Sequence, residues 1–254
     1  MNRNLILTTL LAGGVLVGTT ACKSRYCVTG ISQTRYEVTS ALDSDPDKQT
    51  IDFLRPYTAK VDSVMGQKLG FSDQFLTRTG MESLLGNFLT TVLRTSAAPY
   101  FDGKPAQVGI MNIGGIRANL PKGIITLRDV FEVSPFDNYL CVTQVSGKQL
   151  LDIFHDLAQY KLCTQGGARI VARNDGTIIS ATIDGQQVNP DSTYTMATID
   201  YLAEGNDKLV SMKQVSGKKT TKLTLRDCII NYIKSQTAAG KHISEQLDGR
   251  FVFE

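Results

Sequence analysis

The chain has 254 residues, of which 42% are hydrophobic and 20% are charged, a balance typical of a globular protein that buries a sizeable core. Its net charge is only +3, its basic residues are scattered and it contains no tryptophan, so the composition argues against nucleic acid as a partner. A local site for an anionic small molecule remains compatible with these numbers.

The N-terminal segment MNRNLILTTLLAGGVLVGTTAC is typical of an export signal rather than of folded structure. It has a basic start at Arg3, an apolar stretch that is too short for a good transmembrane helix, and small residues directly before Cys22. We expect residues 1–21 to be a lipoprotein signal peptide and Cys22 to be lipid-modified. The protein would then be a periplasmic or outer-membrane lipoprotein of the cell envelope, attached to the membrane through its N-terminal lipid. The alternative is an ordinary secretory signal, because Thr19 stands where a leucine is usual.

The segment from residue 22 to 46 is mixed polar and is predicted to be a tether of low order. Within it, RYEVTS (35–40) resembles a short strand. A helical pattern of apolar residues begins at Asp47, and Asp45-Pro46 is predicted to supply the cap and first turn. Pro56 lies inside this pattern and is expected to kink or split the helix.

From residue 47 to 254 the sequence alternates irregularly between helical and strand patterns. Helices are predicted over 81–97, 126–133, 146–160 and 223–236. Strands are predicted over 106–112, 139–145, 168–172, 177–185 and 194–202. Since no internal repeat is visible, these elements predict one α+β domain over 47–254, in which a mixed sheet is covered by helices.

The remaining cysteines have no spacing typical of a zinc site. They are Cys27, Cys141, Cys163 and Cys228. An exported protein could pair them as disulfides. Buried free thiols are at least as consistent with the pattern, because Cys141 lies in a strand-like run and Cys228 in a helix-like run. No particular disulfide is predicted.

The stretch MNIGGIRAN follows a predicted strand and is the first candidate for a binding site. Its two adjacent glycines allow the backbone to approach a ligand without a Cβ in the way. Arg117 follows on the same loop, and its planar guanidinium suits a carboxylate or a phosphate. A simple Gly-Gly turn with a surface arginine explains this pattern equally well when it is taken alone.

Two further stretches carry aromatic and acidic side chains. In SPFDN, Phe136 is interpreted as an anchoring aromatic that is buried under a turn stiffened by proline. In TIDYLAEGND, a strand is expected to end near Tyr201, which could present a flat face to a base or a sugar. Asp207 could accept hydrogen bonds from hydroxyl or ring N–H groups. Taken alone, this second stretch is more typical of a solvated turn after a strand.

In their order and spacing, several stretches together resemble the C-terminal domain of bacterial and animal 5′-nucleotidases. They are NIGGIRANLPKGIITLRDVFEVSPFDN, ESLLGNFLTTVL upstream of it, VSGKQLLDIF after it, YTMATIDYLAEGND near the end, and the closing DGRFVFE. The resemblance runs from about Asp47 to the C-terminus, which is nearly the whole mature chain. It implies the fold of that domain, in which the substrate is bound.

The resemblance also implies roles for individual residues. Arg117 matches an arginine that contacts the nucleotide. Tyr201 matches the second of two aromatics that sandwich the base, and Asp207 matches an aspartate that helps to hold the ligand. Asn112 and Gly115 fall on the loop that shapes the pocket.

The sequence departs from the family pattern at two places in this implied site. The first aromatic of the sandwich is expected near Leu162, where the nearest aromatic is Tyr160. Stacking is worth on the order of 1–3 kcal/mol per base, so the loss of one face would weaken or broaden base recognition. The family's Gly-Gly-Asp-Gly is altered to GNDK at 205–208.

Full-length members of the family carry a metallophosphatase domain before this one, and its two metal ions clamp the phosphate ester. The present chain has two histidines, His155 and His242, which are far apart and have no carboxylate spacing that suggests a metal cage. Both are interpreted as structural or surface residues, and no nucleophile–base pair is visible. We therefore expect no catalytic residue, metal ligand or cofactor in this chain, and a divalent metal pair only in a partner chain.

The sequence leaves three hypotheses open. In the first, the chain recognises a nucleotide or related phosphoester as the substrate-binding half of a split 5′-nucleotidase-type hydrolase, and a separate metallophosphatase chain supplies metals and catalysis. In the second, it is a lipoprotein that binds nucleosides, sugars or nucleotides without cleaving them. In the third, it is an interaction protein that has lost its ligand. All three predict no phosphatase activity from the isolated chain.

Overall fold

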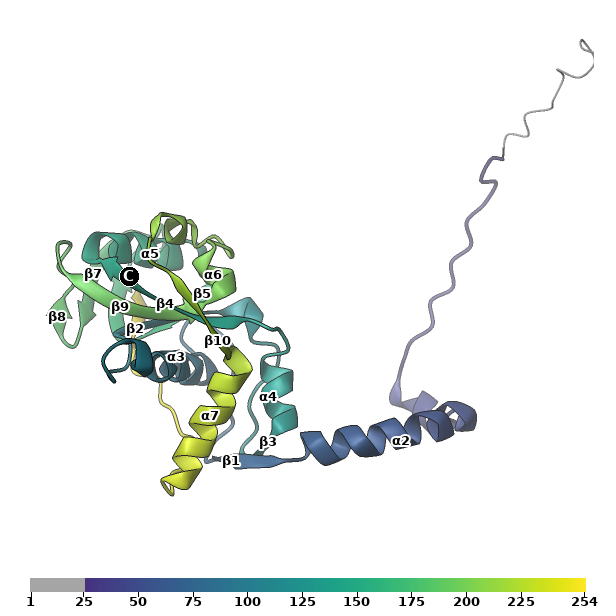
Figure 1. Cartoon of the computed structure of the whole chain (residues 1–254). Coiled ribbons are helices and arrows are strands. Elements are labelled where there is room, and N and C mark those ends of the chain that lie inside the picture. The colour runs from purple at the N-terminus through teal and green to yellow at the C-terminus, as the bar shows by residue number, and fades with distance from the viewer. Residues whose placement is uncertain (1–25) are drawn as a thin grey trace, which may run out of the picture. The chain divides into compact units, whose positions relative to one another are not determined.

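The computed structural model describes residues 26–254 (Figure 1). The predicted signal peptide and the predicted lipid site at Cys22 lie outside the described residues. Contacts divide the chain into two compact units, 1–52 and 53–254. Within residues 26–254, no helix is both long enough and apolar enough to cross a membrane.

The described part of the first unit contains little regular structure. Residues 26–39 form neither helix nor strand, and a 3₁₀ helix follows at Ser40–Ser44. The prediction of a strand at RYEVTS is therefore wrong. A strand needs a neighbour for its backbone hydrogen bonds, and these residues pair with no other segment of the described chain.

Helix α2 (Lys48–Met65) spans the division between the units. The carboxylate of Asp47 caps it by accepting a hydrogen bond from the backbone N–H of Thr50 at 3.0 Å. The prediction that Asp45-Pro46 supplies the cap is therefore wrong. The helix also continues through Pro56 as one element, so the expected split does not occur. A proline removes one backbone hydrogen bond, and the bonds of the other turns keep the helix continuous.

A five-stranded mixed sheet forms the centre of the second unit, with the strand order β10-β4-β9-β2-β5. The strands are β2 (Val108–Asn112), β4 (Tyr139–Ser146), β5 (Cys163–Gly166), β9 (Thr193–Ile199) and β10 (Lys219–Thr224). β2 and β9 run parallel, and the other neighbours in this sheet run antiparallel. All residues of β2 are buried, as expected for a continuous apolar run inside a sheet. Because β2 and β9 are parallel neighbours, the loops that follow them leave the same edge of the sheet.

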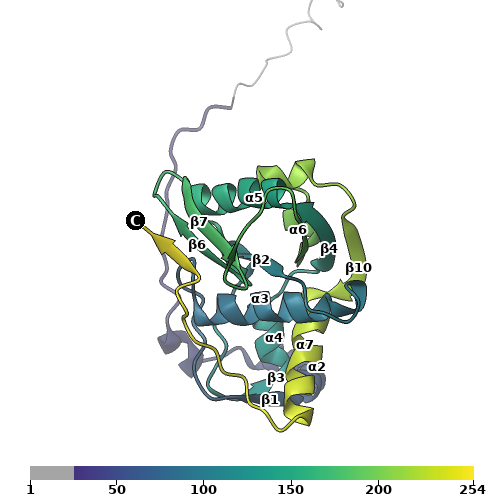
Figure 2. The same cartoon turned by 90° about the vertical axis from the view of Figure 1, so that its left-hand side faces the viewer.

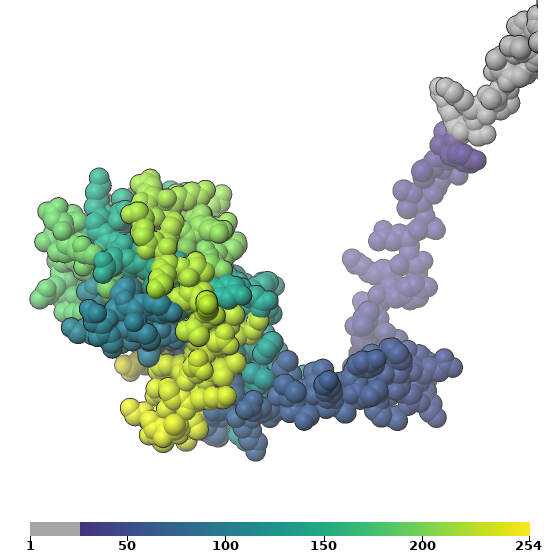
Figure 3. Space-filling view, viewed as in Figure 1, coloured from purple at the N-terminus to yellow at the C-terminus, as the bar shows by residue number. Residues whose placement is uncertain are grey.

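Helices pack on both sides of this sheet. They are α3 (Leu84–Ser96), α5 (Gly147–Tyr160) and α7 (Leu225–Ala238). A fourth helix, α4 (Leu127–Val133), packs against α7. α3 and α5 lie on opposite faces (Figure 2), and α7 keeps one face at the surface of the unit (Figure 3). The side chains of Ser83, Ser146 and Thr224 cap α3, α5 and α7 by accepting backbone N–H groups. The predicted α+β class is confirmed.

Two smaller sheets complete the unit. The first has the order β11-β6-β7-β8, and the second pairs β1 with β3. Their bounds are β1 (Lys68–Ser72), β3 (Gly123–Thr126), β6 (Ala168–Ala172), β7 (Ile178–Ile183), β8 (Gln186–Gln187) and β11 (Phe251–Phe253). β6 and β7 match predicted strands. The sequence patterns missed β1, β3, β5, β8, β10 and β11. Most of these strands are short and are defined by pairing with distant residues, whereas β8 has only two residues and pairs with the neighbouring β7.

The buried cysteines are free thiols. Cys141 lies in β4, Cys163 in β5 and Cys228 in α7, while Cys27 is exposed. Burial raises the pKa of all three buried thiols, and that of Cys228 rises to about 11. They therefore behave as small apolar core residues, in agreement with the interpretation of Cys141 and Cys228 as buried thiols.

Candidate functional site

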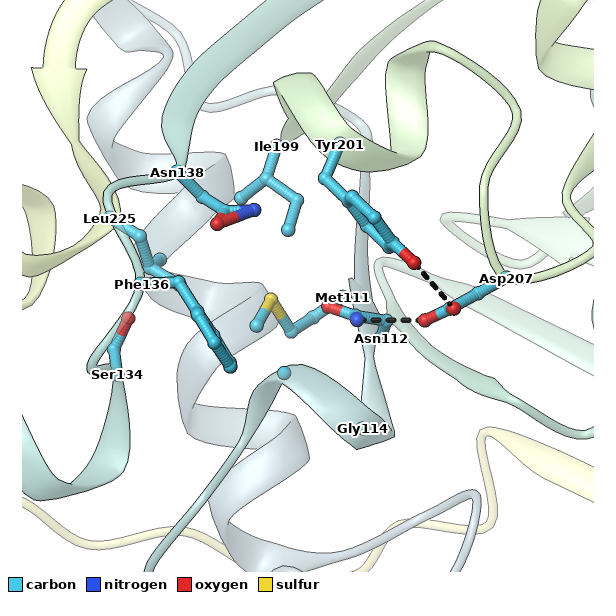
Figure 4. Close-up of a pocket in the computed structure, with 11 residues that line it drawn as sticks. Met111, Asn112, Gly114, Ser134, Phe136, Asn138, Ile199, Tyr201, Asp207 and Leu225 are labelled. Carbon is cyan, nitrogen blue, oxygen red and sulfur yellow. Dashed lines mark hydrogen bonds between the residues drawn. The ribbon is translucent and has the colours of Figure 1, made fainter. Parts of the chain in front are cut away.

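A cavity of about 340 Å³ lies at the edge of the main sheet where β2 and β9 end (Figure 4). Ligands of folds with parallel strands often bind at this edge, because the loops after neighbouring strands diverge there. The lining residues come from the ends of these strands, the turn after β2, the loop after α4, the short helix and loop that follow β9, and the start of α7. They are Met111, Asn112, Gly114, Gly115, Ser134, Phe136, Asn138, Ile199, Tyr201, Asp207 and Leu225.

Asp207 lies at one wall of the cavity, where two side chains hold its carboxylate. Nδ2 of Asn112 donates to Oδ2 at 2.8 Å, and the phenol of Tyr201 donates to Oδ1 at 3.0 Å (Figure 4). The hydrogen bond to Asp207 raises the pKa of Tyr201, so the phenol stays a donor at neutral pH. The carboxylate keeps a fixed orientation, with lone pairs left to accept hydrogen bonds from a ligand.

Tyr201 lies on a short helix. β9 ends at Ile199, and α6 (Asp200–Ala203) begins at once, so the expectation that the strand runs to about Tyr201 is wrong. The reason is Asp200, whose carboxylate accepts the backbone N–H of Tyr201 at 2.8 Å and that of Tyr139 at 3.1 Å. These two bonds turn the chain into α6 and tie it to the start of β4.

Asn112 and Gly115 form the floor of the site next to Asp207. The side chain of Asn112 is buried, and Gly115 lies directly against it. A Cβ on Gly115 would overlap Oδ1 of Asn112. The glycine is therefore required for the close approach that turns the amide of Asn112 toward Asp207.

Arg117 lies beside the cavity, outside the set of residues that line it. Its Nη1 donates to the carbonyl oxygen of Gly114 at 3.1 Å, so the guanidinium folds back over its own turn. Nη1 of Arg78 donates to the carbonyl oxygen of Ile116 at 3.1 Å, which brings a second cation to the same turn. The sequence patterns did not single out Arg78.

The predicted binding residues fall into two groups in the structure. Asn112, Gly115, Tyr201 and Asp207 meet at the cavity, whereas Arg117 only adjoins it.

Phe136 lines the cavity on the side opposite Tyr201 (Figure 4). Phe136 is 49% exposed as a residue, so its interpretation as a buried anchor is wrong. Arg226 on α7 contacts the same loop, and its Nη1 donates to the carbonyl oxygens of Ser134 at 3.1 Å and Phe136 at 2.9 Å. Both carbonyl groups are thereby held against α7, while the ring of Phe136 lies in the wall of the cavity.

Asn138 is a further lining residue that the sequence patterns did not single out. Its carbonyl oxygen accepts the backbone N–H of Leu225 at 2.8 Å, which joins the loop after α4 to the start of α7. The side-chain amide has no hydrogen-bond partner among the described residues and lies in the cavity wall (Figure 4). It can therefore offer both a donor and an acceptor to a ligand.

The place expected for the first stacking aromatic does not supply a ring to the cavity. Tyr160 ends α5 and Leu162 follows it, and neither belongs to the lining of the cavity. Both side chains are partly exposed elsewhere on the surface, at 39% and 43%. Among the described residues, Phe136 is the only aromatic other than Tyr201 that lines this cavity.

Both histidines are held by structural contacts away from the cavity. Nδ1 of His155 lies 2.8 Å from the carbonyl oxygen of Gly176, and Nδ1 of His242 lies 2.7 Å from Oδ1 of Asp73. Within residues 26–254, no group of three or more His, Cys, Asp or Glu side chains could hold a metal ion. The residues that the structure describes therefore do not fit a catalytic metal pair.

Residues 59–214 match the family described as 5′-nucleotidase, C-terminal domain. The chain belongs to this family. It is 28% identical over 165 residues to the 5′-nucleotidase of Vibrio vulnificus (strain CMCP6), a match that covers 63% of this chain and 30% of that protein. It is 27% identical over 198 residues to Protein UshA of Escherichia coli (strain K12), a match that covers 75% of this chain and 35% of that protein. The chain thus spans about a third of the length of these curated relatives.

Solved structures of related proteins share the fold of this 5′-nucleotidase C-terminal domain. The 5′-nucleotidase precursor from Thermus thermophilus matches with a TM-score of 0.71 and 24% identity, over 83% of this chain and 44% of that one. The NAD nucleotidase (NadN) of Haemophilus influenzae matches with a TM-score of 0.64 and 17% identity, over 85% of this chain and 44% of that one. The predicted resemblance to this domain is confirmed.

The chemistry of the cavity in this 5′-nucleotidase C-terminal domain suits a flat, hydrogen-bonding molecule. Its lining offers one carboxylate, two amide side chains and two aromatic rings, and it contains no Lys or Arg among the described residues. Carboxylate and amide groups recognise hydroxyl and N–H groups, while aromatic faces suit a planar ring.

Proposed function

We propose that the chain binds a nucleotide or a related phosphoester by its nucleoside part, as the substrate-binding half of a 5′-nucleotidase-type hydrolase. The observation that carries this proposal is the carboxylate of Asp207, which Asn112 and Tyr201 hold in a cavity with aromatic walls. Such a carboxylate accepts hydrogen bonds from ribose hydroxyls or from base N–H groups. Membership of residues 59–214 in the 5′-nucleotidase C-terminal family supports the same assignment.

The base of the nucleoside would lie between Phe136 and Tyr201, which line opposite sides of the cavity (Figure 4). Phe136 is 49% exposed and Tyr201 is 40% exposed, so both residues have solvent-accessible area that a ligand can bury. A planar ring that enters between two aromatic faces removes this apolar area from water. Phe136 would therefore take the place of the aromatic that was expected near Leu162.

The phosphate of a bound nucleotide would lie outside this cavity. Asp207 is the only residue of the described lining with a full charge, and that negative charge would oppose a phosphate there. Arg117 lies beside the cavity through its bond to the carbonyl oxygen of Gly114, and Arg78 contacts the same turn after β2 through the carbonyl oxygen of Ile116. Guanidinium groups in this place would suit a phosphate that projects from the cavity toward the turn.

We propose further that a metallophosphatase chain supplies the metal pair and the catalytic groups. The lack of a metal-binding cluster within residues 26–254 supports the assignment of the metal pair to a separate chain. A metal pair would clamp the attacking and leaving oxygens of the phosphate ester, while the present chain orients the nucleoside. A mixture of the two chains would then hydrolyse a nucleotide that neither chain hydrolyses alone.

Attachment to a membrane is a separate part of the proposal. The basic start, apolar stretch and small residues before Cys22 support lipid modification of that cysteine in the cell envelope. Mass spectrometry of the mature N-terminal peptide would test it. An unmodified Cys22, or Cys22→Ser protein that still fractionates with membranes, would contradict this part and leave the binding proposal untouched.

The central test measures binding and cleavage separately. The mature chain would be titrated by calorimetry with adenosine, AMP and ribose 5-phosphate, and phosphate release would be followed with added Mn²⁺ or Zn²⁺. We expect adenosine and AMP to bind without release of phosphate. Hydrolysis by the pure chain would overturn the assignment of catalysis to a partner. If neither adenosine nor AMP bound, with or without a metallophosphatase partner, the recognition proposal would be wrong.

A second candidate function is the capture of free nucleosides without cleavage. It is favoured by the charge of the cavity, since Asp207 is the only acid or base of the described lining besides the phenol of Tyr201. This function predicts that adenosine binds more tightly than AMP and that no metallophosphatase is activated by the chain. The first function predicts that AMP binds at least as tightly as adenosine.

A further inference from the structure

We infer that Arg226, which does not line the cavity, is the positioning residue that holds the ring of Phe136 in place for a ligand. This inference rests on the proposed function, because it assumes that a planar base enters beside Phe136. It deepens that function by naming the residue of α7 on which the second aromatic wall depends.

Arg226 contacts the loop after α4 through both terminal nitrogens of its guanidinium. Its Nη1 donates to the carbonyl oxygens of Ser134 at 3.1 Å and Phe136 at 2.9 Å, and its Nη2 pairs with the carboxylate of Asp137. One guanidinium therefore holds three positions of the same turn, 134, 136 and 137. A planar fork with several donors can do this, whereas a single ammonium group cannot match the same geometry.

The guanidinium itself has little freedom to move. The side chain of Arg226 is only 14% exposed, and its Cζ lies 4.7 Å from the centroid of the Phe131 ring on α4. Such a cation over an aromatic face is attracted by it. Arg226 thus joins α7, α4 and the loop after α4 into one rigid support.

The ring of Phe136 depends on this support, because its own neighbours do not enclose it. Phe136 is 49% exposed, and Pro135 and Asp137 on either side of it in the sequence are also exposed. Arg226 holds the carbonyl group of Phe136 and therefore the stretch of backbone that carries the ring. By contrast, Tyr201 is fixed without Arg226, through the bond from its phenol to Asp207.

A ring that is fixed before the ligand arrives loses less freedom on binding, so the affinity is higher. Arg226 would therefore strengthen binding without touching the ligand. The ion pair with Asp137 should contribute less than the two carbonyl bonds, because the side chain of Asp137 is 75% exposed and water screens the pair.

The first test is a double-mutant cycle on the mature chain, with adenosine affinity measured by calorimetry. Phe136→Ala should weaken binding by about tenfold or more, since it removes one stacking face. Arg226→Gln should weaken binding by a similar factor, and the double variant should bind little worse than Phe136→Ala alone. Additive losses would overturn the positioning role.

Three further variants serve as controls for this cycle. Arg226→Lys keeps the charge but not the planar fork, so this variant should still bind adenosine more weakly than the wild type. It can also take the place of Arg226→Gln in the cycle if Arg226→Gln does not fold. Asp137→Asn leaves both carbonyl bonds and should bind within about threefold of the wild type. Phe75→Ala should bind normally, because Phe75 is similarly exposed at 51% and lies outside the cavity lining.

The second test reads the motion of the ring directly. The chain contains no tryptophan, so Phe136→Trp would introduce a single tryptophan at this position, whose fluorescence can be excited selectively over that of the tyrosines. Arg226→Gln in this background should speed the decay of its fluorescence anisotropy. The same change should leave a reporter at Phe75→Trp unaffected. An unchanged decay at position 136 would show that Arg226 does not hold the ring.

The outcomes separate this inference from the proposed function. If Arg226→Gln binds adenosine like the wild type while Asp207→Ala does not, Arg226 has no positioning role and the proposed function stands. If the wild type binds ribose 5-phosphate as tightly as AMP, base recognition is wrong, and the inference fails with it. If the wild type binds no nucleoside or nucleotide, both the inference and the proposed function fail.

Discussion

Asn112 and Asp207 are 95 residues apart in the sequence and meet in a hydrogen bond of 2.8 Å from Nδ2 to Oδ2. The bond joins the end of β2 to the loop after α6, so it closes one wall of the cavity. Asn112 is buried, and its Oδ1 has no hydrogen-bond partner among the described residues. Its amide therefore contributes a single bond, and that bond is made to the one carboxylate of the site.

Replacement of Asp207 should remove the main polar contact to a nucleoside. Hydrogen bonds to charged groups contribute about 1.5–3 kcal/mol, so Asp207→Ala should weaken adenosine binding by roughly tenfold to a hundredfold. Calorimetry would measure the loss. Asp191→Asn, at an exposed turn outside the cavity, is the control and should bind normally. Equal affinities for Asp207→Ala and the wild type would remove Asp207 from the site.

Two adjacent glycines allow a matched comparison in the turn after β2. A Cβ on Gly115 would overlap Oδ1 of Asn112, whereas a Cβ on Gly114 meets no atom within 4 Å. Gly115→Ala should therefore displace the amide from Asp207 and weaken nucleoside binding by about tenfold. Gly114→Ala should leave the amide in place and cost little. The reverse order of effects would show that the position of Asn112 does not control binding.

Much of the fold could be predicted from local patterns. The apolar run at 106–112 became the buried strand β2, and the helical patterns at 81–97 and 146–160 became α3 and α5. The meeting of Asn112 with Asp207 could not be predicted locally. It was implied only by the resemblance to 5′-nucleotidases, because no pattern within either segment refers to the other.

Phe136 shows why the rest of the site escaped prediction. A Pro-Phe corner favours burial of the ring, and nothing near it in the sequence suggests otherwise. Its carbonyl oxygen is held by Arg226, which lies 90 residues later. Arg117 illustrates the same limit, since its guanidinium folds back onto Gly114 through a contact that the motif alone does not specify.

Lys208 occupies a backbone conformation that suits glycine. Its φ is +63°, and the family pattern has glycine at this place. A non-glycine residue in this conformation strains the folded state by roughly 1–2 kcal/mol. Glycine removes that strain, but it makes the unfolded chain more flexible, which lowers the free energy of unfolding by about 0.4–1 kcal/mol. Lys208→Gly should therefore raise the free energy of unfolding by about 0.5–1 kcal/mol. Urea denaturation would measure this change with an unaltered m value.

The matched control for Lys208→Gly is Lys234→Gly, which places glycine at an exposed position inside α7. That change should lower the free energy of unfolding by about 0.5–1 kcal/mol, because glycine disfavours helix. If both substitutions destabilise the protein equally, the left-handed conformation of Lys208 carries no strain.

Glu245 should make stability depend on pH near neutrality. It lies in the segment between α7 and β11. Burial raises its pKa from an ordinary value of 4.5 to about 7. Two nearby charges act on this pKa in opposite directions, since Arg250 lowers it and Asp248 raises it. The folded state therefore holds the proton more tightly than the unfolded state. The stabilising contribution is complete below about pH 4.5 and is lost as the pH rises through about 7.

The comparison of the wild type with Glu245→Gln, which cannot ionise at this position, isolates this contribution. The melting temperature of the wild type should fall by a few degrees relative to that of the variant as the pH rises from 4.5 to 7. Glu132→Gln, at an exposed position on α4, should follow the wild-type profile. Parallel profiles for the wild type and Glu245→Gln would show that burial does not hold the proton on Glu245 in the folded protein.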